Sequence, residues 1–373
     1  MPSDSAPSPR YRICVITPRL SITGVPLAQA RFAGALARRG HEVEFVIGYD
    51  DGLPAPVIPG VKVTVWDKPR VATMLQPAIG YLRRERPDVV FSAEDHLNGL
   101  MLTAAILARS TAKISGSSRV SPFDSYSNTP FTKGWLRKQA LRAVMWRADA
   151  LTCVSKDMVN QYRTIFPDGP HVCVYNIIDD AASREKAGEP VDHPWFNQRA
   201  VPVIVAAGTL TRRKAFHDLV EAFALITQRG RDARLAIFGE GHQRERLEGL
   251  VRDHGLTDRV WLPGRTANPR AYFAKASVSA LSSRAEGLPN VLVETMVCGC
   301  TPASTDCPTG PREVIGDDEF GYLAAVHDPR SLASALEKAL DHPVSRGKLA
   351  QATAPFEESQ VIRRHFEVLG LAG

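Results

Sequence analysis

Short apolar runs alternate with helix-like segments along the whole chain, and this alternation constrains the fold more than any other feature. Runs rich in Val, Ile and Leu are typical of strands that are buried on both faces of a parallel sheet. Strands that alternate with helices predict an α/β protein. In the first half the runs are Ile13–Ile16, Val43–Ile47, Val89–Ser92, Lys113–Gly116, Leu151–Val154 and Val172–Tyr175. In the second half they are Val203–Ala207, Leu235–Phe238, Val260–Leu262, Val278–Leu281, Ala303–Thr305 and Tyr322–Val326.

The alternation is interrupted once, between residues 179 and 200, where the chain is rich in charge, Ala and Pro. We interpret this stretch as a linker, and a length of 373 residues is typical of two domains. We predict two Rossmann-like, doubly wound α/β domains, residues 11–178 and 201–355, facing each other across a cleft. Residues 1–10 are predicted to form a disordered tail. A C-terminal helix at about 356–373 is expected to pack back on the first domain.

Composition narrows the class of protein. Hydrophobic residues make up 44% and charged residues 23%, so the chain can form buried cores. No apolar stretch approaches the ~18–20 residues of a membrane span, and no apolar segment precedes the first strand, so we expect no signal peptide. The six cysteines form no C-x-x-C pair and are expected to be reduced thiols. We therefore expect a cytoplasmic protein.

The segment 101–150 is strongly basic, with eight Lys or Arg residues and two Asp or Glu residues. Such a surface suits an anionic membrane face or a phosphorylated lipid, which predicts peripheral association with the inner face of the plasma membrane. The alternative is a solvated charged helix. We find no motif for nucleic acid. The clustered residues are Lys133, Trp135, Arg137, Lys138, Arg142, Trp146 and Arg147.

Strands also alternate with helices in dehydrogenases, and a glycine fingerprint distinguishes their nucleotide-binding loop. The segment after the first run, 17–24, lacks the three-glycine fingerprint of a dinucleotide fold. Gly239 and Gly241 form a G-x-G without a third glycine, and there is no Walker A sequence. These features disfavour a nicotinamide enzyme.

The most informative segment is 282–294, in which a strand, a Gly/Pro loop and a helix follow one another. The helix is expected to start at about Asn290, a favoured capping residue, and helix starts suit a diphosphate. Glu286 lies in the loop and Glu294 about one helical turn on, so one carboxylate can bind sugar hydroxyls and the other a ribose. Glu240 and Glu248 have the same spacing but are interpreted as a solvated helix face, so context rather than spacing distinguishes the pair.

The segment reads Glu-Gly-Leu-Pro-Asn-Val-Leu-Val-Glu at 286–294 and resembles the E-G-L-P-N-V-L-x-E branch of the retaining glycosyltransferases of family 4, glycosyl transferases group 1. These are two-domain enzymes of the GT-B fold. The resemblance covers nearly the whole chain. Further matching segments are 39–43, 86–90, 174–176, 193–196, 208–214, 238–241, 263–264, 298–299 and 304–313.

The resemblance implies roles for individual residues. Glu286 would bind the donor sugar, Glu294 the ribose and Lys214 the diphosphate, while backbone at Gly264 and Arg265 would approach the base. Gly24 would approach the phosphates on cleft closure. The donor-binding residues implied in this way are Gly24, Gly208, Thr209, Arg213, Lys214, Gly239, Gly264, Arg265, Glu286, Gly287, Leu288, Pro289, Asn290, Val291, Leu292 and Glu294.

The sequence departs from the family pattern at two positions. The family's Gly-Arg-Leu reads Gly208-Thr209-Leu210, so an expected cation is missing, and Arg212 or Arg213 is its candidate substitute. The family's Gly-Gly reads Thr23-Gly24. Because the two glutamates are present, we still expect an active enzyme.

Two residues of the first domain are candidates for the acceptor side. His96 follows a predicted strand and is a candidate catalytic residue for the acceptor or the transferred sugar; alternatively it is simply a helix N-terminal residue, with Asp95 as the cap. Arg119 is a candidate ligand for an acceptor phosphate, or else a surface arginine. The catalytic set is Glu286, Lys214 and His96. No cofactor and no metal are expected, since the implied chemistry is metal-independent.

The resulting prediction is a retaining hexosyltransferase. It would move a hexose or N-acetylhexosamine from a nucleotide diphosphate sugar to a glycan or lipid-linked acceptor in envelope polysaccharide biosynthesis, including lipopolysaccharide. A UDP-sugar is favoured as donor and GDP-mannose is second. The alternatives are a UDP-N-acetylhexosamine 2-epimerase of the same fold, and an inactive nucleotide-binding homologue.

Overall fold

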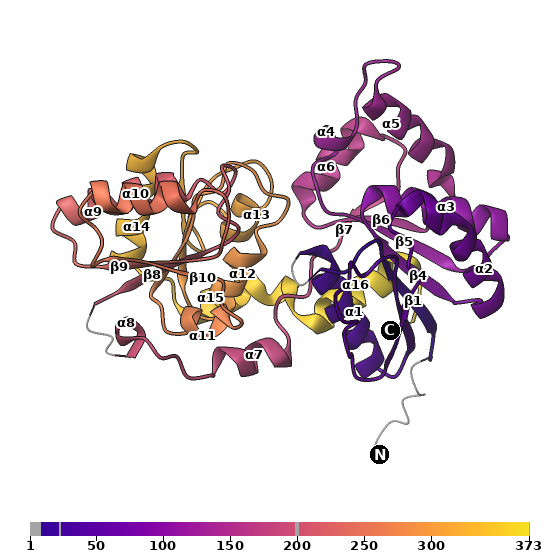
Figure 1. Cartoon of the computed structure of the whole chain (residues 1–373), viewed down its shortest axis with the longest axis horizontal. Helices are drawn as coiled ribbons and strands as arrows, with labels where there is room; N and C mark the ends of the chain where they lie inside the picture. Colours follow the sequence, from indigo (N-terminus) through magenta and orange to yellow (C-terminus); the bar gives the residue numbers. More distant parts are fainter. Residues whose placement is uncertain (1–8, 22–23, 198–200, 373) are drawn as a thin grey trace. The chain divides into compact units, whose positions relative to one another are not determined.

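The computed structural model describes residues 9–21, 24–197 and 201–372. The chain forms two compact units, residues 1–177 with 358–373, and residues 178–357 (Figure 1). Each unit contains one parallel sheet with helices on its faces, so the predicted α/β fold with two Rossmann-like domains is confirmed. Most of the predicted tail, residues 1–8, lies outside the described residues.

The first unit has a seven-stranded sheet in the order β3-β2-β1-β4-β5-β6-β7. Neighbouring strands are parallel; Ile13 of the central strand β1, for example, pairs with Val43 of β2 and with Val89 of β4. The strands are β1 (Arg12–Thr17), β2 (Glu42–Ile47), β3 (Val61–Val65), β4 (Val89–Ala93), β5 (Lys113–Ser118), β6 (Ala150–Cys153) and β7 (His171–Cys173).

One strand, β3, was not among the predicted runs. Its sequence alternates Val with Lys62 and Thr64, and all of its residues are half-buried or exposed. The strand pairs only with β2, so it lies at the edge of the sheet. An edge strand is not covered on both faces, which explains why it lacks a continuous apolar run like those of β1 and β8.

The helices of the first unit include the last helix of the chain. Ile362 and Phe366 of this helix, α16, are buried in the same core as Ile13 of β1 and Phe32 of α1. Figure 1 shows α16, at the yellow end of the chain, within this unit. The helices are α1 (Val25–Arg38), η1 (Val71–Met74), α2 (Leu75–Glu85), α3 (Asp95–Ala108), α4 (Pro122–Ser125), α5 (Lys133–Val144), η2 (Met145–Arg147), α6 (Lys156–Ile165) and α16 (Glu358–Leu369).

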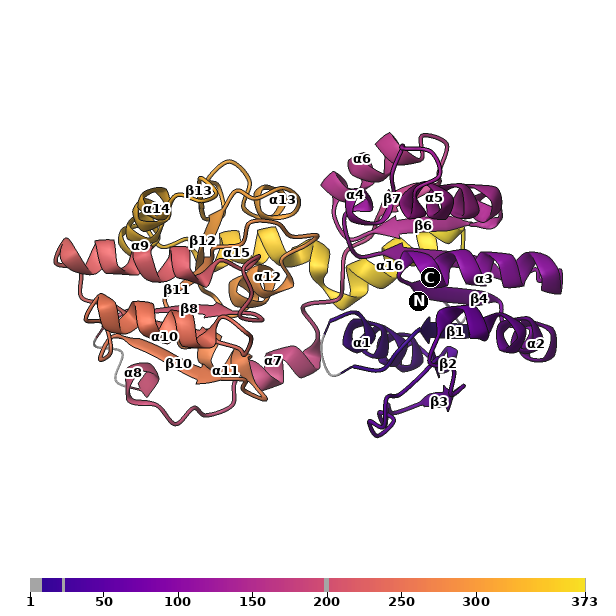
Figure 2. The ribbon, with the colours of Figure 1, turned by 45° about the horizontal axis from the view of Figure 1, so that its top comes forward.

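The second unit has a six-stranded parallel sheet in the order β10-β9-β8-β11-β12-β13. One core joins the sheet to α9, α10 and α14, and a second core joins it to α8, α11 and α12, so both faces are covered (Figure 2). The strands are β8 (Val203–Ala207), β9 (Arg234–Phe238), β10 (Val260–Gly264), β11 (Val278–Leu281), β12 (Thr301–Thr305) and β13 (Tyr322–Ala324). The helices are α7 (Ala181–Ala187), α8 (Pro194–Asn197), α9 (Phe216–Gln228), α10 (Arg244–Asp253), α11 (Pro269–Phe273), α12 (Asn290–Val297), α13 (Pro311–Ile315), α14 (Pro329–Asp341), α15 (Arg346–Thr353) and η3 (Ala354–Phe356).

The stretch interpreted as a linker, 179–200, belongs to the second unit and contains α7 and α8. The Asp180 side chain caps α7 by accepting a hydrogen bond from the Ser183 amide at 2.7 Å. Phe196 of α8 is buried in the core of this unit beside Phe273. Within the described residues this stretch is therefore folded against the unit rather than extended; residues 198–200 lie outside them.

The structure also bears on two expectations drawn from composition: that no segment spans a membrane, and that the cysteines are not paired. A search of the helices in the described ranges finds none with the length and apolar content needed to span a bilayer. All six cysteines are free thiols, and five of them are buried. The expectation of unpaired core cysteines is therefore confirmed.

Candidate functional site

The candidate donor site lies where four neighbouring strands of the second unit end. The amide of Gly208, after β8, donates to the carbonyl of Phe238 at 2.9 Å, and the amide of Gly239 donates to the carbonyl of Gly264 at 2.8 Å. A Cβ atom on Gly239 would overlap the Gly208 carbonyl, and one on Gly241 would overlap the Leu210 carbonyl. The G-x-G sequence is thus required for two loops to approach each other closely.

A buried ion pair lies at the centre of this edge. Lys214 Nζ is 2.6 Å from Glu286 Oε1, and the two side chains are only 16% and 6% exposed. Lys214 follows β8 and Glu286 follows β11, and these strands are hydrogen-bonded neighbours. Both residues were predicted from the sequence to belong to the donor site. They are 72 positions apart in the chain, and the fold brings them into contact.

The loop that carries Glu286 is held in place by hydroxyl groups. The Ser282 hydroxyl donates to the Lys214 carbonyl at 2.8 Å, and the Thr305 hydroxyl donates to the Ser283 carbonyl at 2.6 Å. The Thr309 hydroxyl donates to the carbonyl of Glu286 itself. Thr305 and Thr309 belong to the segment 304–313, which resembles the family but to which sequence analysis assigned no role. Their hydrogen bonds indicate that they fix the backbone of the Glu286 loop.

Glu294 lies on α12, and its side chain is 26% exposed. Its Oε1 is 3.2 Å from Nη2 of Arg270, a residue that sequence analysis did not select. The residue before the helix is Pro289, which makes no side-chain capping bond, and Asn290 is the first helical residue. The expected start of the helix at about Asn290 is therefore confirmed, but the capping position is occupied by Pro289, and Asn290 is the first residue with helical backbone.

The other pair of glutamates with the same spacing has a different environment. Arg244 is 2.7 Å from Glu240 and 2.9 Å from Glu248, and the two glutamate side chains are about two-fifths exposed, at 42% and 39%. These residues form an exposed ion-pair network on α10 and the loop before it. The interpretation of Glu240 and Glu248 as a solvated face is confirmed.

The implied donor residues differ in exposure. Thr209, Arg213 and Arg265 are exposed, whereas Leu288, Pro289 and Leu292 are buried. The Arg213 carbonyl accepts a hydrogen bond from the Arg284 amide at 2.9 Å, so Arg213 lies beside the Glu286 loop. Gly287, Asn290 and Val291 are half-buried, and Val291 packs on the core that contains Phe273.

A second cluster borders the same loop. Arg284 Nη2 lies 2.9 Å from His217 Nε2 and 3.5 Å from Asp218 Oδ2. Burial lowers the pKa of His217 below its usual range, against the opposing effect of Asp218. The structure thus places His217 in a half-buried polar cluster with Arg284.

In the first unit, His96 is exposed at the start of α3, and its Nε2 lies 3.3 Å from Glu94 Oε2. Glu94 has a positive φ of 79°, which is uncommon for a residue with a side chain. Burial raises the pKa of the Glu94 carboxyl, and the nearby charges of His96 and Arg119 oppose this rise. Gly24, at the start of α1 in the same unit, also has a positive φ, of 70°.

Asp95 does not cap α3, contrary to one of the expectations above. Its carboxylate accepts hydrogen bonds from Ser118 at 2.6 Å, Tyr126 at 2.8 Å and Tyr162 at 2.6 Å. The helix begins at Asp95, and the residue before it, Glu94, makes no side-chain capping bond. Three hydroxyl donors satisfy the carboxylate, which ties α3 to β5, α4 and α6.

Arg119 is not a freely exposed surface arginine. Its guanidinium donates to Asn176 Oδ1 and, at 3.4 Å, to Gln29 Oε1. Burial lowers the pKa of Arg119 to about 10, which Glu94 partly offsets. The structure therefore joins Arg119 to Asn176, the last residue of the matched segment 174–176, on the strand-end side of the first sheet.

Among the described residues, no group of three or more His, Cys, Asp or Glu side chains has an arrangement that could hold a metal ion.

Two family models match the chain. Residues 23–176 match the glycosyl transferase 4-like domain, and residues 194–354 match glycosyl transferases group 1. The matches fall on the two units described above. Together with the fold, they indicate a GT-B glycosyltransferase of the family 4 type.

Relatives of known name are similar over part of the chain. A Campylobacter jejuni N-acetylgalactosamine-N,N'-diacetylbacillosaminyl-diphospho-undecaprenol 4-alpha-N-acetylgalactosaminyltransferase is 32% identical over 197 residues, 52% of this chain and 52% of that protein. A Rhizobium meliloti lipopolysaccharide core biosynthesis glycosyltransferase, LpsE, is 30% identical over 46% of each chain. The chain thus spans about half the length of these curated relatives.

Solved structures with a similar fold extend over nearly the whole chain. Sucrose-phosphate synthase from Thermosynechococcus elongatus has a TM-score of 0.75 at 18% identity, over 96% of this chain and 98% of that one. The Anabaena protein HepE, solved with UDP and glucose, has a TM-score of 0.71 at 17% identity, over 97% of this chain and 100% of that one. At this identity the likeness concerns the fold.

The close packing under the Glu286 loop leads to a prediction. Gly310 has a φ of 95°, and a Cβ atom there would lie 2.5 Å from Pro289 Cδ. Gly230 has a similar φ of 86°, but a Cβ atom there would meet nothing within 4 Å. Gly230→Ala should lower the free energy of unfolding by about 1–2 kcal/mol through backbone strain alone, and Gly310→Ala by a further 1–3 kcal/mol or so through the clash. Urea denaturation measures both, and equal losses would contradict the packing argument.

Proposed function

We propose that the chain is a retaining glycosyltransferase that moves a hexose or N-acetylhexosamine from a nucleotide diphosphate sugar to a glycan or lipid-linked acceptor. The observation that carries this proposal is the buried Lys214–Glu286 pair at the strand ends of the second unit. The names of three similar proteins support the donor and acceptor classes. One relative is named for a diphospho-undecaprenol-linked sugar and another for lipopolysaccharide core biosynthesis, and a structural neighbour was solved with UDP and glucose.

The pair offers complementary groups to the donor. Glu286 is an acceptor for sugar hydroxyls, because its carboxylate has two oxygens with about four acceptor positions and Lys214 takes part of that capacity. Lys214 provides positive charge for a departing diphosphate, so the leaving group needs no metal ion in this proposal. The exposed Arg213 beside the loop compensates for Thr209, which replaces the family's arginine.

Retention of configuration needs no protein nucleophile in this proposal. The glycosidic bond to the diphosphate breaks, and the departing phosphate oxygen takes the proton of the acceptor hydroxyl on the same face of the sugar. The acceptor oxygen then forms the new bond to the anomeric carbon. The protein contributes by positioning the reactants and stabilising the leaving group.

The acceptor side of the proposal lies in the first unit. A groove of about 740 Å³ between α3, α5 and η1 includes His96 and Arg137 among its lining residues. Leu75, Leu100 and Leu141 give it an apolar wall. An apolar groove with a histidine and an arginine suits an acceptor that carries a phosphate and an apolar chain, which is why we favour a lipid-linked acceptor.

The donor class can be tested by thermal shift with UDP, GDP, ADP and their sugars. We expect UDP compounds to raise the Tm most, since a ligand that binds the folded state stabilises it. Lys214→Ala should then weaken UDP binding about tenfold or more in calorimetry, because a charge-assisted contact is worth about 1.5–3 kcal/mol. Lys348→Ala, an exposed lysine of the same unit, is the control. Unchanged UDP affinity in Lys214→Ala would refute this role.

Transfer itself should depend on Glu286. We expect Glu286→Ala to fold and to lose at least about a hundredfold in rate, since charge-assisted hydrogen bonds to two sugar hydroxyls would be missing. Glu337→Ala, which breaks the partly exposed pair with Arg229, is the control and should retain activity. Wild-type-like turnover by Glu286→Ala with the best donor would contradict the proposal.

Product analysis by NMR separates the rival functions. An epimerised sugar nucleotide would identify a 2-epimerase. Nucleotide binding without transfer or donor hydrolysis across an acceptor panel would identify an inactive homologue. A new glycoside with the anomeric configuration of the donor is the expected product.

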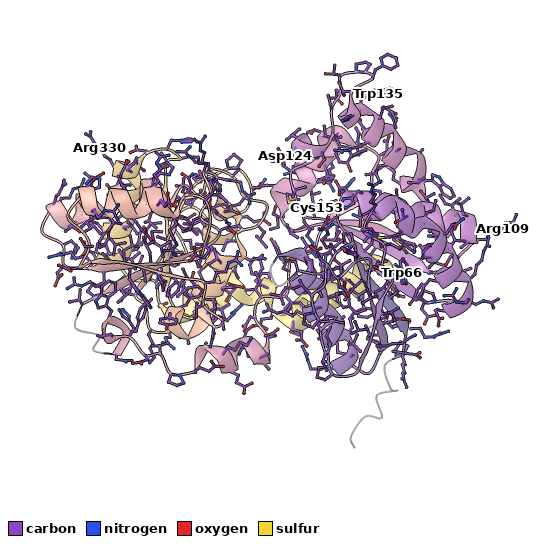
Figure 3. All side chains as sticks on the ribbon, viewed as in Figure 1. Trp66, Arg109, Asp124, Trp135, Cys153 and Arg330 are labelled. Carbon is purple, nitrogen blue, oxygen red and sulfur yellow. The ribbon has the colours of Figure 1, made fainter. Side chains whose placement is uncertain are left out.

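We also propose that the chain acts at the cytoplasmic face of an anionic membrane. The α4–α5 region projects from the first unit, with Trp135 beside its tip (Figure 3). Phe131, before α5, is 87% exposed, and Trp146, in η2 after α5, is 71% exposed. Arg137 and Arg142 are exposed on α5 itself. Arg147 does not contribute to this surface, because its guanidinium is bonded to the carbonyls of Ser110 and Ala112.

Flotation with anionic liposomes at low salt tests this location. Arg137→Glu/Arg142→Glu should weaken binding by more than about tenfold, since each basic residue near an anionic surface contributes about 1 kcal/mol. Arg363→Glu/Arg364→Glu, which reverses two exposed charges on α16, is the matched control. Absence of flotation of the wild type at low salt would eliminate the proposal.

A further inference from the structure

The second unit contains a buried arginine, Arg270, whose surroundings point to a defined role. Its side chain is only 5% exposed, and it lies near the start of α11. Burying an arginine cation costs several kcal/mol unless an anion compensates it. The carboxylate that compensates it in the ion pair is Glu294, the residue proposed to bind the ribose of the donor.

Two acceptors fix the orientation of this guanidinium. Nη2 of Arg270 lies 3.2 Å from Glu294 Oε1, and it also donates to the carbonyl of Ile178 at 3.0 Å. Ile178 is the first residue of the second unit. Because a guanidinium is planar and rigid, a carboxylate and a backbone carbonyl that both contact Nη2 restrict its orientation.

The backbone that carries Arg270 is anchored as well. The Asn268 side-chain amide donates to the Lys186 carbonyl at 2.7 Å and lies 2.7 Å from Glu189 Oε2. The start of α11 is thus tied to the last turn of α7 and to the segment that follows it. The backbone and the guanidinium of Arg270 are therefore both held in place, so this side chain can orient another side chain that contacts it.

Glu294 is the side chain that Arg270 orients. It is partly exposed on a helix, and a free glutamate in that position would sample several rotamers. The contact with Arg270 engages Oε1, and the carboxylate keeps further acceptor positions for a ligand. A carboxylate that is oriented before the ligand arrives loses less conformational entropy on binding.

Nη1 of Arg270 is buried and has no hydrogen-bond partner among the described protein atoms. An arginine present only to fill the core would leave a costly donor unsatisfied beside Glu294. Nη1 belongs to the same guanidinium as Nη2, so it offers a second donor on the group that contacts Glu294.

We propose that Arg270 is a positioning residue for Glu294, holding its carboxylate so that it accepts the vicinal 2' and 3' hydroxyls of a nucleoside diphosphate. This inference rests on the proposed function, because the ribose belongs to the nucleotide sugar donor. Arg270 does not touch the ribose in this arrangement and acts only through Glu294.

The test compares UDP with 2',3'-dideoxy-UDP by calorimetry, since only UDP carries the hydroxyls. The wild type should bind UDP roughly tenfold or more tighter than the dideoxy compound, as expected for a charge-assisted contact. In Arg270→Met, which has similar length and no charge, UDP affinity should fall to about that of the dideoxy compound, whose own affinity should be unchanged. Glu294→Ala should have the same effect, and the double variant should be no worse than either single variant.

Arg229→Met removes the arginine of the Arg229–Glu337 pair in the same unit and should leave both affinities unchanged. If Arg270→Met does not fold, Arg270→Lys is used, because lysine keeps the charge but lacks the planar guanidinium whose Nη2 contacts both Glu294 and the Ile178 carbonyl. An equal loss for both ligands, or no loss for either, would overturn the positioning role. A wild type that binds UDP and dideoxy-UDP equally would overturn it too, whereas a wild type that binds no nucleoside diphosphate would overturn the proposed function.

Discussion

The candidate site of the second unit depends on one ion pair, between Lys214 and Glu286. The two side chains are 16% and 6% exposed and lie 2.6 Å apart, so each charge compensates the other only while the loops after β8 and β11 hold fixed positions. The hydroxyls of Ser282, Thr305 and Thr309 provide this fixation by bonding to loop carbonyls. Much of the polar sequence near the site is thus explained by the need to keep one ion pair together.

The sequence predicted the strand positions well because most strands are buried on both faces and consist mainly of apolar or small residues. The strand that was missed is β3, an edge strand in which the larger polar residues Lys62 and Thr64 alternate with valine. Boundaries and individual contacts were harder to predict. Asn290 and Asp95 both have the chemistry of capping residues, but one continues its helix and the other binds three hydroxyls that come from elsewhere in the fold.

Motif spacing alone separates functional from ordinary glutamates poorly. Glu286 and Glu294 have the same separation as Glu240 and Glu248, yet the first pair contacts a buried lysine and a buried arginine, and the second is bridged on the surface by Arg244. The strand–loop–helix context in the sequence predicted this difference. It did not predict Arg270, because a single arginine in a short helix carries no local signal of the residue it faces in space.

The two units differ in how they use the chain: residues 178–357 form the second unit in one piece, whereas the first unit needs residues from both ends. During synthesis the second unit can therefore fold while the sheet of the first unit still lacks α16. Until Ile362 and Phe366 leave the ribosome, the apolar face shared by Phe32 and Ile13 stays uncovered. Nascent chains of this protein should therefore pass through a long stage at which they are prone to aggregate and dependent on chaperones.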